Sequence, residues 1–215
     1  MNATTTGTPQ PAATTPPDGR NLRRDRNRDA VVTALLELYR EGDLGPSADA
    51  IAARAGISAR SLFRYFEDID ALVRAAIARQ QEHLAPLYAL DASADQPLAE
   101  RVERFAAGRV RLIEGMGEVG RLARTLATRQ PLILAELARV RRTLRRQLAD
   151  LFAAELEALD RQAPGARATA LAAADVVTSW ESFDLMRNDQ GLSRDAAVAA
   201  MGAALLRLLD PGTAG

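Results

Sequence analysis

Apolar residues recur along most of this chain at the spacing of amphipathic α-helices, and no stretch alternates as a β-strand would. The first clear apolar face belongs to a predicted helix over about residues 27–41. Further helices are predicted after Ser47, after Ser58, from Asp68 to Leu84, and over about 97–115, 118–128, 130–160, 166–188 and 193–209. Gly and Pro residues separate these segments. The pattern therefore predicts an all-α fold.

The segment over residues 47–72 combines two short helical patterns with a tight turn at Gly56. Gly56 can adopt the left-handed conformation that ends a helix, and Ala52 is small enough for two helices to cross closely. This is the layout of a helix-turn-helix, whose second helix enters the major groove of DNA. The segment predicts a DNA-binding element, and double-stranded DNA as a partner.

The residues of this segment also carry a family resemblance. The run Ser47-x3-Ile51-Ala52-x2-Ala55-Gly56-Ile57-Ser58-x3-Leu62-Phe63-x-Tyr65-Phe66-x5-Leu72 resembles the DNA-binding domain of TetR-family transcriptional regulators. The resemblance implies an N-terminal three-helix helix-turn-helix domain and a larger C-terminal helical domain for ligand binding and dimerisation. It also implies a homodimeric repressor that binds a palindromic operator and responds to a small-molecule effector. The alternative is a ligand-binding or interaction dimer that has lost operator selectivity.

Three parts of the chain are expected: a disordered tail over 1–19, a DNA-binding domain over 20–75, and a ligand-binding and dimerisation domain over 76–215. Five arginines lie between residues 20 and 28, against a single acid. This run is either a solvated helix start or an arm that contacts phosphates or the minor groove. Arg24 and Arg28 are its candidate DNA contacts.

Within the second helix of the motif, Arg60 is the candidate for reading a base, because a guanidinium can bond both O6 and N7 of guanine. Ala59 is placed to touch a thymine methyl group, and Ser61 to contact either a base or a phosphate. Phosphate contacts are predicted for Ser47, Ser58, Arg64 and Tyr65. For Arg64 the alternative is an ion pair on the helix surface.

Two positions depart from the pattern of the resembled family. Phe63 replaces a Tyr whose hydroxyl usually bonds a phosphate, and Ile69 replaces a Lys that opens the following helix. Neither side chain can bond a phosphate, although the helix N-terminus at Ile69 keeps its backbone N–H groups. These departures keep the alternative open.

Charge is unevenly distributed although the net charge is zero. Residues 20–66 hold nine Arg against six acids, whereas residues 67–215 hold 19 Arg against 21 acids. The chain has no Cys and a single histidine, His83, so disulfides, thiolate chemistry and a His-bearing metal cluster are not expected. No enzyme activity or cofactor is predicted. Apolar runs are too short for a membrane span and no signal peptide is visible, so a cytoplasmic protein is expected.

The last two predicted helices carry large apolar residues interleaved with small ones, which suits close helix packing. The resemblance implies that they form the homodimer interface, and the alternative is an ordinary intramolecular core. A mainly apolar pocket for a hydrophobic or aromatic ligand is expected in the C-terminal domain. Its candidate lining residues are Phe105, Met116, Thr125, Thr128, Trp180, Phe183 and Asp184, and the alternative for most of them is a place in the core.

Overall fold

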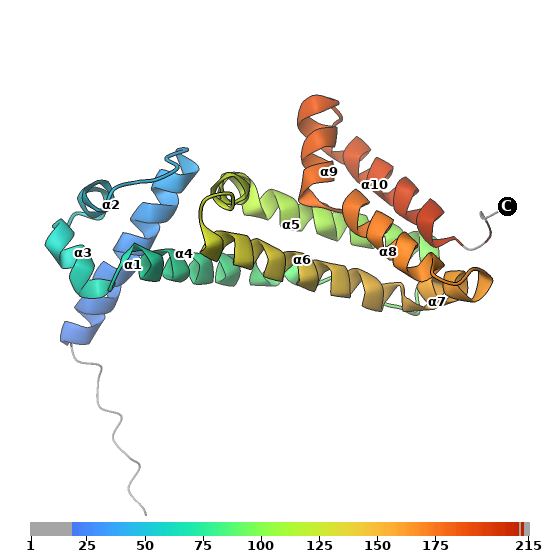
Figure 1. Ribbon diagram of the computed structural model, residues 1–215, viewed down its shortest axis with the longest axis horizontal. Helices are drawn as coiled ribbons and strands as arrows, with labels where there is room; N and C mark the ends of the chain where they lie inside the picture. The colour runs from blue at the N-terminus through green and yellow to red at the C-terminus, as the bar shows by residue number, and fades with distance from the viewer. Residues whose placement is uncertain (1–18, 211, 213–215) are drawn as a thin grey trace, which may run out of the picture.

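The computed structural model describes residues 19–210 and 212, with side chains from residue 22 onward. In this part of the chain all regular structure is helical, which confirms the all-α prediction. The molecule is elongated (Figure 1). An N-terminal part over residues 19–84, called the head, lies at one end, and a helical part over residues 85–210, called the body, lies at the other. The tail predicted over 1–19 lies, except for Gly19, outside the described residues.

Four helices build the head and its link to the body: α1 (Gly19–Arg40), α2 (Ala48–Arg54), α3 (Ala59–Tyr65) and α4 (Ile69–Leu84). The side chains of Ser47, Ser58 and Asp68 each accept a hydrogen bond from a backbone N–H in the first turn of the following helix. Such caps satisfy N–H groups that have no partner within the helix. The predicted helix starts at Ser47 and Ser58 are therefore confirmed.

The turns between these helices use glycine where the backbone must enter the left-handed region. Gly42 follows α1 with φ +87°, and Gly56 joins α2 to α3 with φ +69°. The conformation expected at Gly56 is thus present. The start of α1 differs from the prediction, because the helix begins at Gly19 and not at about residue 27. The arginine-rich run is therefore part of a helix.

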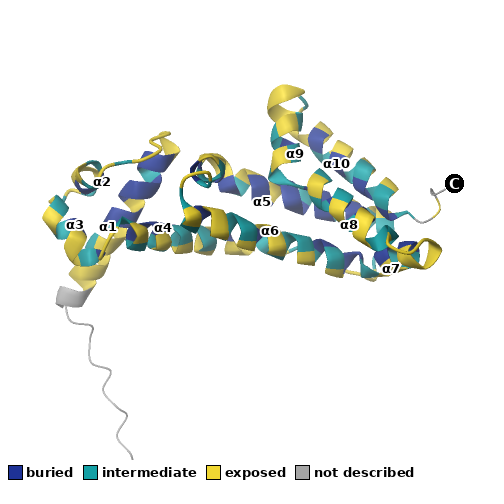
Figure 2. Ribbon diagram, viewed as in Figure 1, coloured by how far each residue is buried: buried dark blue, intermediate teal, exposed yellow. Residues whose placement is uncertain are grey.

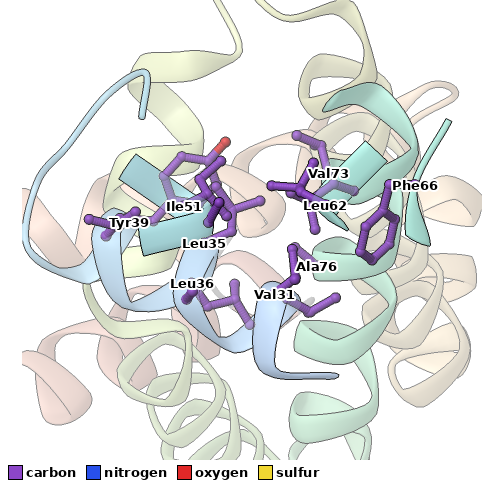
Figure 3. Packing of buried hydrophobic residues seen from close by; sticks show 14 of the residues in the cluster. Val31, Leu35, Leu36, Tyr39, Ile51, Leu62, Phe66, Val73 and Ala76 are labelled. Atoms are coloured by element: carbon purple, nitrogen blue, oxygen red, sulfur yellow. The ribbon is translucent and has the colours of Figure 1, made fainter. Parts of the chain in front are cut away.

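The core of the head forms where α1 crosses the other three helices (Figure 3). Val31 and Leu35 of α1 meet Ile51 of α2 and Leu62 of α3, and each is at most 1% exposed. Burying side chains of this size stabilises the fold by roughly 1.5–3 kcal/mol each. The same cluster continues into the body through Leu122, Leu126 and Ile133, so head and body share one core.

The body contains η1 (Ala85–Tyr88), α5 (Leu98–Leu126), α6 (Pro131–Leu151), α7 (Ala153–Gln162), α8 (Ala166–Val177), α9 (Trp180–Asp184), the π-helical η2 (Leu185–Asp189) and α10 (Arg194–Leu209). Gly117 interrupts α5 with φ +50° and ψ −146°, near the break expected between 115 and 118. The single helices predicted over 130–160 and 166–188 were wrong, since each is divided.

Neither division coincides with a Gly or Pro residue. The first falls at Phe152, which leaves the helical conformation and is fully buried. Its ring meets that of Phe105 edge to face, with centroids 5.5 Å apart. The second falls at Thr178 and Ser179, where the Ser179 side chain caps α9. Tertiary packing and a serine cap therefore set these breaks.

The last helix packs mainly inside the body rather than facing outward. Ala197, Met201, Leu205 and Leu209 of α10 are fully buried, in clusters with residues of α5 and α8. For this face, the intramolecular core is the observed arrangement. Other residues of α8 are exposed (Figure 2). Val176, near the end of α8, is 64% exposed. No helix among the described residues is long and apolar enough to cross a membrane.

Candidate functional site

Helix α3 lies at the outer edge of the head, on the side remote from the body (Figure 1). Leu62 anchors it in the core, while Arg60, Phe63 and Arg64 are exposed. Arg60 makes no hydrogen bond or ion pair with any described residue, so its guanidinium is available to an external acceptor. Ala59 beside it is half-buried and packs against the head core.

The serines at the start of α2 and α3 use their oxygens as caps. Ser47 Oγ accepts from the Ala50 N–H at 3.1 Å, and Ser58 Oγ accepts from the Ser61 N–H at 3.2 Å. The Ser58 hydroxyl also donates to Ser61 Oγ at 3.1 Å. The hydroxyl hydrogens of Ser47 and Ser61 therefore remain available as donors, whereas that of Ser58 is engaged.

Tyr65 joins the end of α3 to α1. Its hydroxyl oxygen accepts hydrogen bonds from Asn27 Nδ2 at 2.9 Å and from an Nη atom of Arg64 at 3.1 Å. These bonds lower the pKa of Tyr65, with Asn27 as the largest cause. The Arg64 guanidinium also lies 5.2 Å from the Tyr65 ring centroid. The hydroxyl hydrogen of Tyr65 and the charge of Arg64 are thus presented together.

The N-terminal part of α1 brings further arginines to this surface. Arg24 is exposed and close enough to act electrostatically on Tyr65. Arg28 is also exposed, and its guanidinium lies 5.0 Å from the ring centroid of Phe66. Arg24, Arg28, Arg64 and Tyr65 therefore gather where α1 meets the end of α3. By contrast, Ile69 at the start of α4 packs against the head core.

A cavity of about 400 Å³ lies where the head meets the body. Its walls include Leu36 and Tyr39 of α1 and several residues of α4, together with residues of α5, α6, α8 and α9. Most of the wall is apolar. At one edge, the Arg124 guanidinium lies 4.0 Å from the Trp180 ring centroid, and Arg124 and Arg141 both bond Glu181.

Arg109 is the most deeply buried charged group of the cavity wall, with 3% of its surface exposed. One Nη donates to the Leu144 carbonyl at 3.1 Å, and the guanidinium lies 4.8 Å from the Phe105 ring centroid. Its Nε has no hydrogen-bond partner among the described residues. Burial lowers the pKa of Arg109 to about 10, and the nearby charge of Asp175 partly offsets this effect. Arg109 is therefore charged at neutral pH.

Residues of the link between head and body supply neutral polar groups to the same cavity. The Tyr88 hydroxyl donates to Gln81 Oε1 at 3.2 Å, and both side chains line the wall. Burial raises the pKa of Tyr88, so its hydroxyl stays protonated at neutral pH. Burial also raises the pKa of Tyr39 on α1. No group of His, Asp or Glu side chains among the described residues is arranged to hold a metal ion.

Comparisons with known proteins bear on the head most directly. Residues 32–76 match the model of bacterial regulatory proteins of the tetR family. Residues 32–76 form a TetR-family DNA-binding domain. This match confirms the predicted resemblance and its DNA-binding function. Regulators of this family are DNA-binding transcription factors and not enzymes.

Solved structures extend the similarity in fold beyond the TetR-family domain. A candidate transcriptional regulator of Streptomyces coelicolor A3(2) is 23% identical with a TM-score of 0.60, covering 86% of this chain and 98% of its own. A candidate TetR-family regulator of a Rhodococcus species is 18% identical with a TM-score of 0.60, covering 88% and 100%. A tetR-family regulator of Streptomyces coelicolor is 21% identical with a TM-score of 0.57, covering 86% and 92%. No curated protein matches this chain.

Of the seven candidate ligand residues in the body, two line the cavity between the head and the body, and five do not. Met116 and Trp180 line it. Phe105 and Phe183 are buried in core clusters outside its lining. The other three also lie outside the lining: Thr125 and Thr128 are exposed, and Asp184 pairs with Arg121 at 3.0 Å.

Arg109, Tyr39 and Gln81 line the cavity but were not predicted from the sequence as cavity residues. A signal for Arg109 existed, because it falls within the apolar stripe that includes Phe105, Val110 and Ile113 at helical spacing. A charged residue within such a stripe must either find a partner or face a cavity. The other two residues carry no comparable signal.

Proposed function

We propose that this protein is a ligand-responsive transcriptional repressor that binds a palindromic operator as a homodimer. The observation that carries the proposal is the exposed face of α3 within a TetR-family domain, with Arg60 unengaged at its start. In this mechanism α3 enters the major groove and Arg60 bonds the O6 and N7 atoms of a guanine.

Phosphate contacts fix the head on the duplex. Tyr65 donates its hydroxyl hydrogen to a phosphate oxygen while Arg64 supplies charge beside it. Arg24 and Arg28 add positive charge from α1. Ser47 and Ser61 retain free hydroxyl hydrogens for the same purpose, whereas Ser58 acts mainly as the cap of α3.

Dimerisation through α8 and α10 would place two heads on two half-sites, which is why a palindrome is expected. The buried face of α10 is occupied by α5, so the interface uses the opposite faces. These carry exposed Ala199, Ala200 and Ala203 on α10 and exposed Val176 on α8. Small residues of this kind allow close approach of helices from a second subunit.

Ligand response is supported by the composition of the cavity wall. Because α1 and α4 belong to the head and also line the cavity, a ligand contacts the elements that position α3. A ligand that prefers the head orientation unsuited to two half-sites shifts the population away from DNA. Repression relieved by ligand follows from this arrangement, and a cytoplasmic location follows from the DNA target.

The second candidate function is a ligand-binding dimer without operator selectivity. Phe63 and Ile69 favour it, because Phe63 is 50% exposed without a polar atom and Ile69 is packed against the core. Neither side chain provides a phosphate contact.

Selection of random double-stranded DNA by the purified full-length protein separates the two functions. The repressor is expected to enrich a palindrome, and Arg60→Ala is expected to change or relax the preferred bases by about 1–3 kcal/mol of discrimination per half-site. Arg40→Ala, an exposed arginine at the far end of α1, serves as the matched control and should retain the wild-type preference.

Failure to enrich any sequence at low salt, with the protein confirmed dimeric and ligand-free, would favour the second function. Equal losses on specific and random DNA for Arg60→Ala would contradict its assignment to base reading.

A further inference from the structure

Arg109 differs from every other charged residue of the cavity wall in lacking a charged partner. The wall contains three acids, and each is engaged elsewhere: Glu136 by Arg139 at 2.6 Å, Asp175 by Arg145 at 3.2 Å, and Glu181 by Arg141 at 2.5 Å. Among the described residues, Arg109 forms no ion pair.

A buried cation without a counter-charge is costly to the ligand-free protein. Removing a guanidinium from water costs several kcal/mol, which a carbonyl and an aromatic ring recover only in part. Arg109 has the Leu144 carbonyl, the Phe105 face and the charge of Asp175, which acts on it without an ion pair, and its Nε remains unbonded. An anion with an oxygen that accepts from Nε would supply the ion pair that Arg109 lacks.

We propose that the cavity binds a monocarboxylate with an apolar body, whose carboxylate pairs with Arg109. The assignment rests on the proposed ligand response and specifies its ligand class. A carboxylate suits the site because a guanidinium offers parallel N–H donors that match its two oxygens. Nε and one Nη form such a pair on one edge of the group.

The rest of the wall defines the body of the ligand. Ile113, Met116, Val140 and Trp180 present hydrocarbon and aromatic surface, and the volume of about 400 Å³ lies in the range of small-molecule sites. The other two arginines of the wall, Arg124 and Arg141, both pair with Glu181. A second anionic group on the ligand would have to compete with Glu181 for these arginines, which favours one charge over two.

Tyr88 supplies a further donor near the charged end. It acts electrostatically on Arg109, and its hydroxyl is bonded only to the neutral Gln81 side chain. That hydroxyl can turn to a carboxylate oxygen. Since Gln81 lies on α4, this exchange changes a contact of the helix that leads to the TetR-family domain.

The test compares two pairs of probes in which one member ends in a carboxylate and the other in a neutral hydroxyl group: decanoate with 1-decanol, and 2-naphthoate with 2-naphthol. Trp180 is the sole tryptophan of the chain and lines the cavity, so its fluorescence reports binding to the full-length protein. At least one carboxylate is expected to bind about tenfold or more tightly than its alcohol. The better pair identifies an aliphatic or an aromatic body.

Arg109→Met keeps an unbranched apolar side chain, although a shorter one, and removes the charge. It should abolish the preference for carboxylate over alcohol and, by relieving the buried charge, leave the melting temperature of the ligand-free protein unchanged or higher. Arg111→Met is the matched control, because Arg111 lies on the same helix and is exposed. It should retain the wild-type preference.

Three results would overturn the assignment: equal affinity for acid and alcohol in the wild type, no binding of either carboxylate, or an unchanged preference in Arg109→Met. A structural Arg109 would lower the melting temperature on substitution without changing that preference. If the carboxylate preference is absent but the protein still selects a palindrome, the ligand class is rejected and the DNA-binding function is kept. Carboxylate binding with no effect on DNA affinity would instead reject the ligand response.

Discussion

The chain has 28 arginines and no lysine. Because these residues are chemically identical, their roles differ only through the groups that surround them. Arg101 is buried and paired with Glu155, so its charge is compensated within the body. Arg109 is equally buried without such a pair, and Arg60 is exposed without one. Arg60 could be predicted from the sequence, because its position at the start of α3 is determined by the neighbouring residues of the helix-turn-helix motif. The partners of the other two depend on helix packing and were not predictable.

At the same scale, Arg24→Ala tests whether the start of α1 contacts phosphates. Affinity should fall alike for operator and random DNA, and the slope of log affinity against log salt should decrease by about 1, because one counterion fewer is released. Fluorescence anisotropy over a salt series measures both quantities. Arg40→Ala is again the control. A change in preferred sequence, or an unchanged salt slope, would exclude a simple phosphate contact by Arg24.

Helix ends were predictable where a cap or a glycine determines them locally, as at Ser47, Ser58 and Gly56. The division at Phe152 was not, because it follows from burial of that ring against Phe105, a residue distant in sequence. An apolar pocket was predicted, but most of the residues that line the cavity were not, for a related reason. Its volume is what remains between apolar faces of several helices, and a single sequence does not specify how closely those faces approach.

Within α5, position 117 should require glycine because of its backbone conformation, and not because space for a side chain is lacking. A Cβ at this position would meet no atom within 4 Å, yet φ +50° with ψ −146° is strained for any other residue. Gly117→Ala should therefore reduce the free energy of unfolding by about 1–3 kcal/mol. Chemical denaturation measures this change.

Gly108 offers the matched control within the same helix. It has ordinary helical geometry, and a Cβ would lie 3.6 Å from two flexible side chains, so Gly108→Ala should be neutral or stabilise by about 0.4–1 kcal/mol. Equal effects of the two substitutions would show that Gly117 does not need its positive φ.

Over the whole molecule, the head and the body are coupled through one continuous apolar core. Leu126 of α5 is 4% exposed and belongs to the cluster that also contains Leu36 and Tyr39 of α1. Leu126→Ala should cost about 2–5 kcal/mol and increase hydrogen exchange in the head as well as in the body. Mass spectrometry of peptides from α1 and α4 detects the increase.

Leu209→Ala is the control, since Leu209 is fully buried in a separate cluster at the far end of the body. It should cost a similar free energy while leaving exchange in α1 unchanged. Matching exchange patterns in the two variants would mean that the shared core does not couple the head to the body.

In the proposed ligand-responsive dimeric repressor, α1 and α4 form part of the cavity wall, so ligand and operator would act on one conformational equilibrium and their effects on each other would be reciprocal. If ligand weakens operator binding by a given factor, operator occupancy weakens ligand binding by the same factor. Dimers free in solution then take up the ligand before those on DNA. The cellular concentration of this protein, and not the cavity alone, would therefore set the threshold at which repression is lifted.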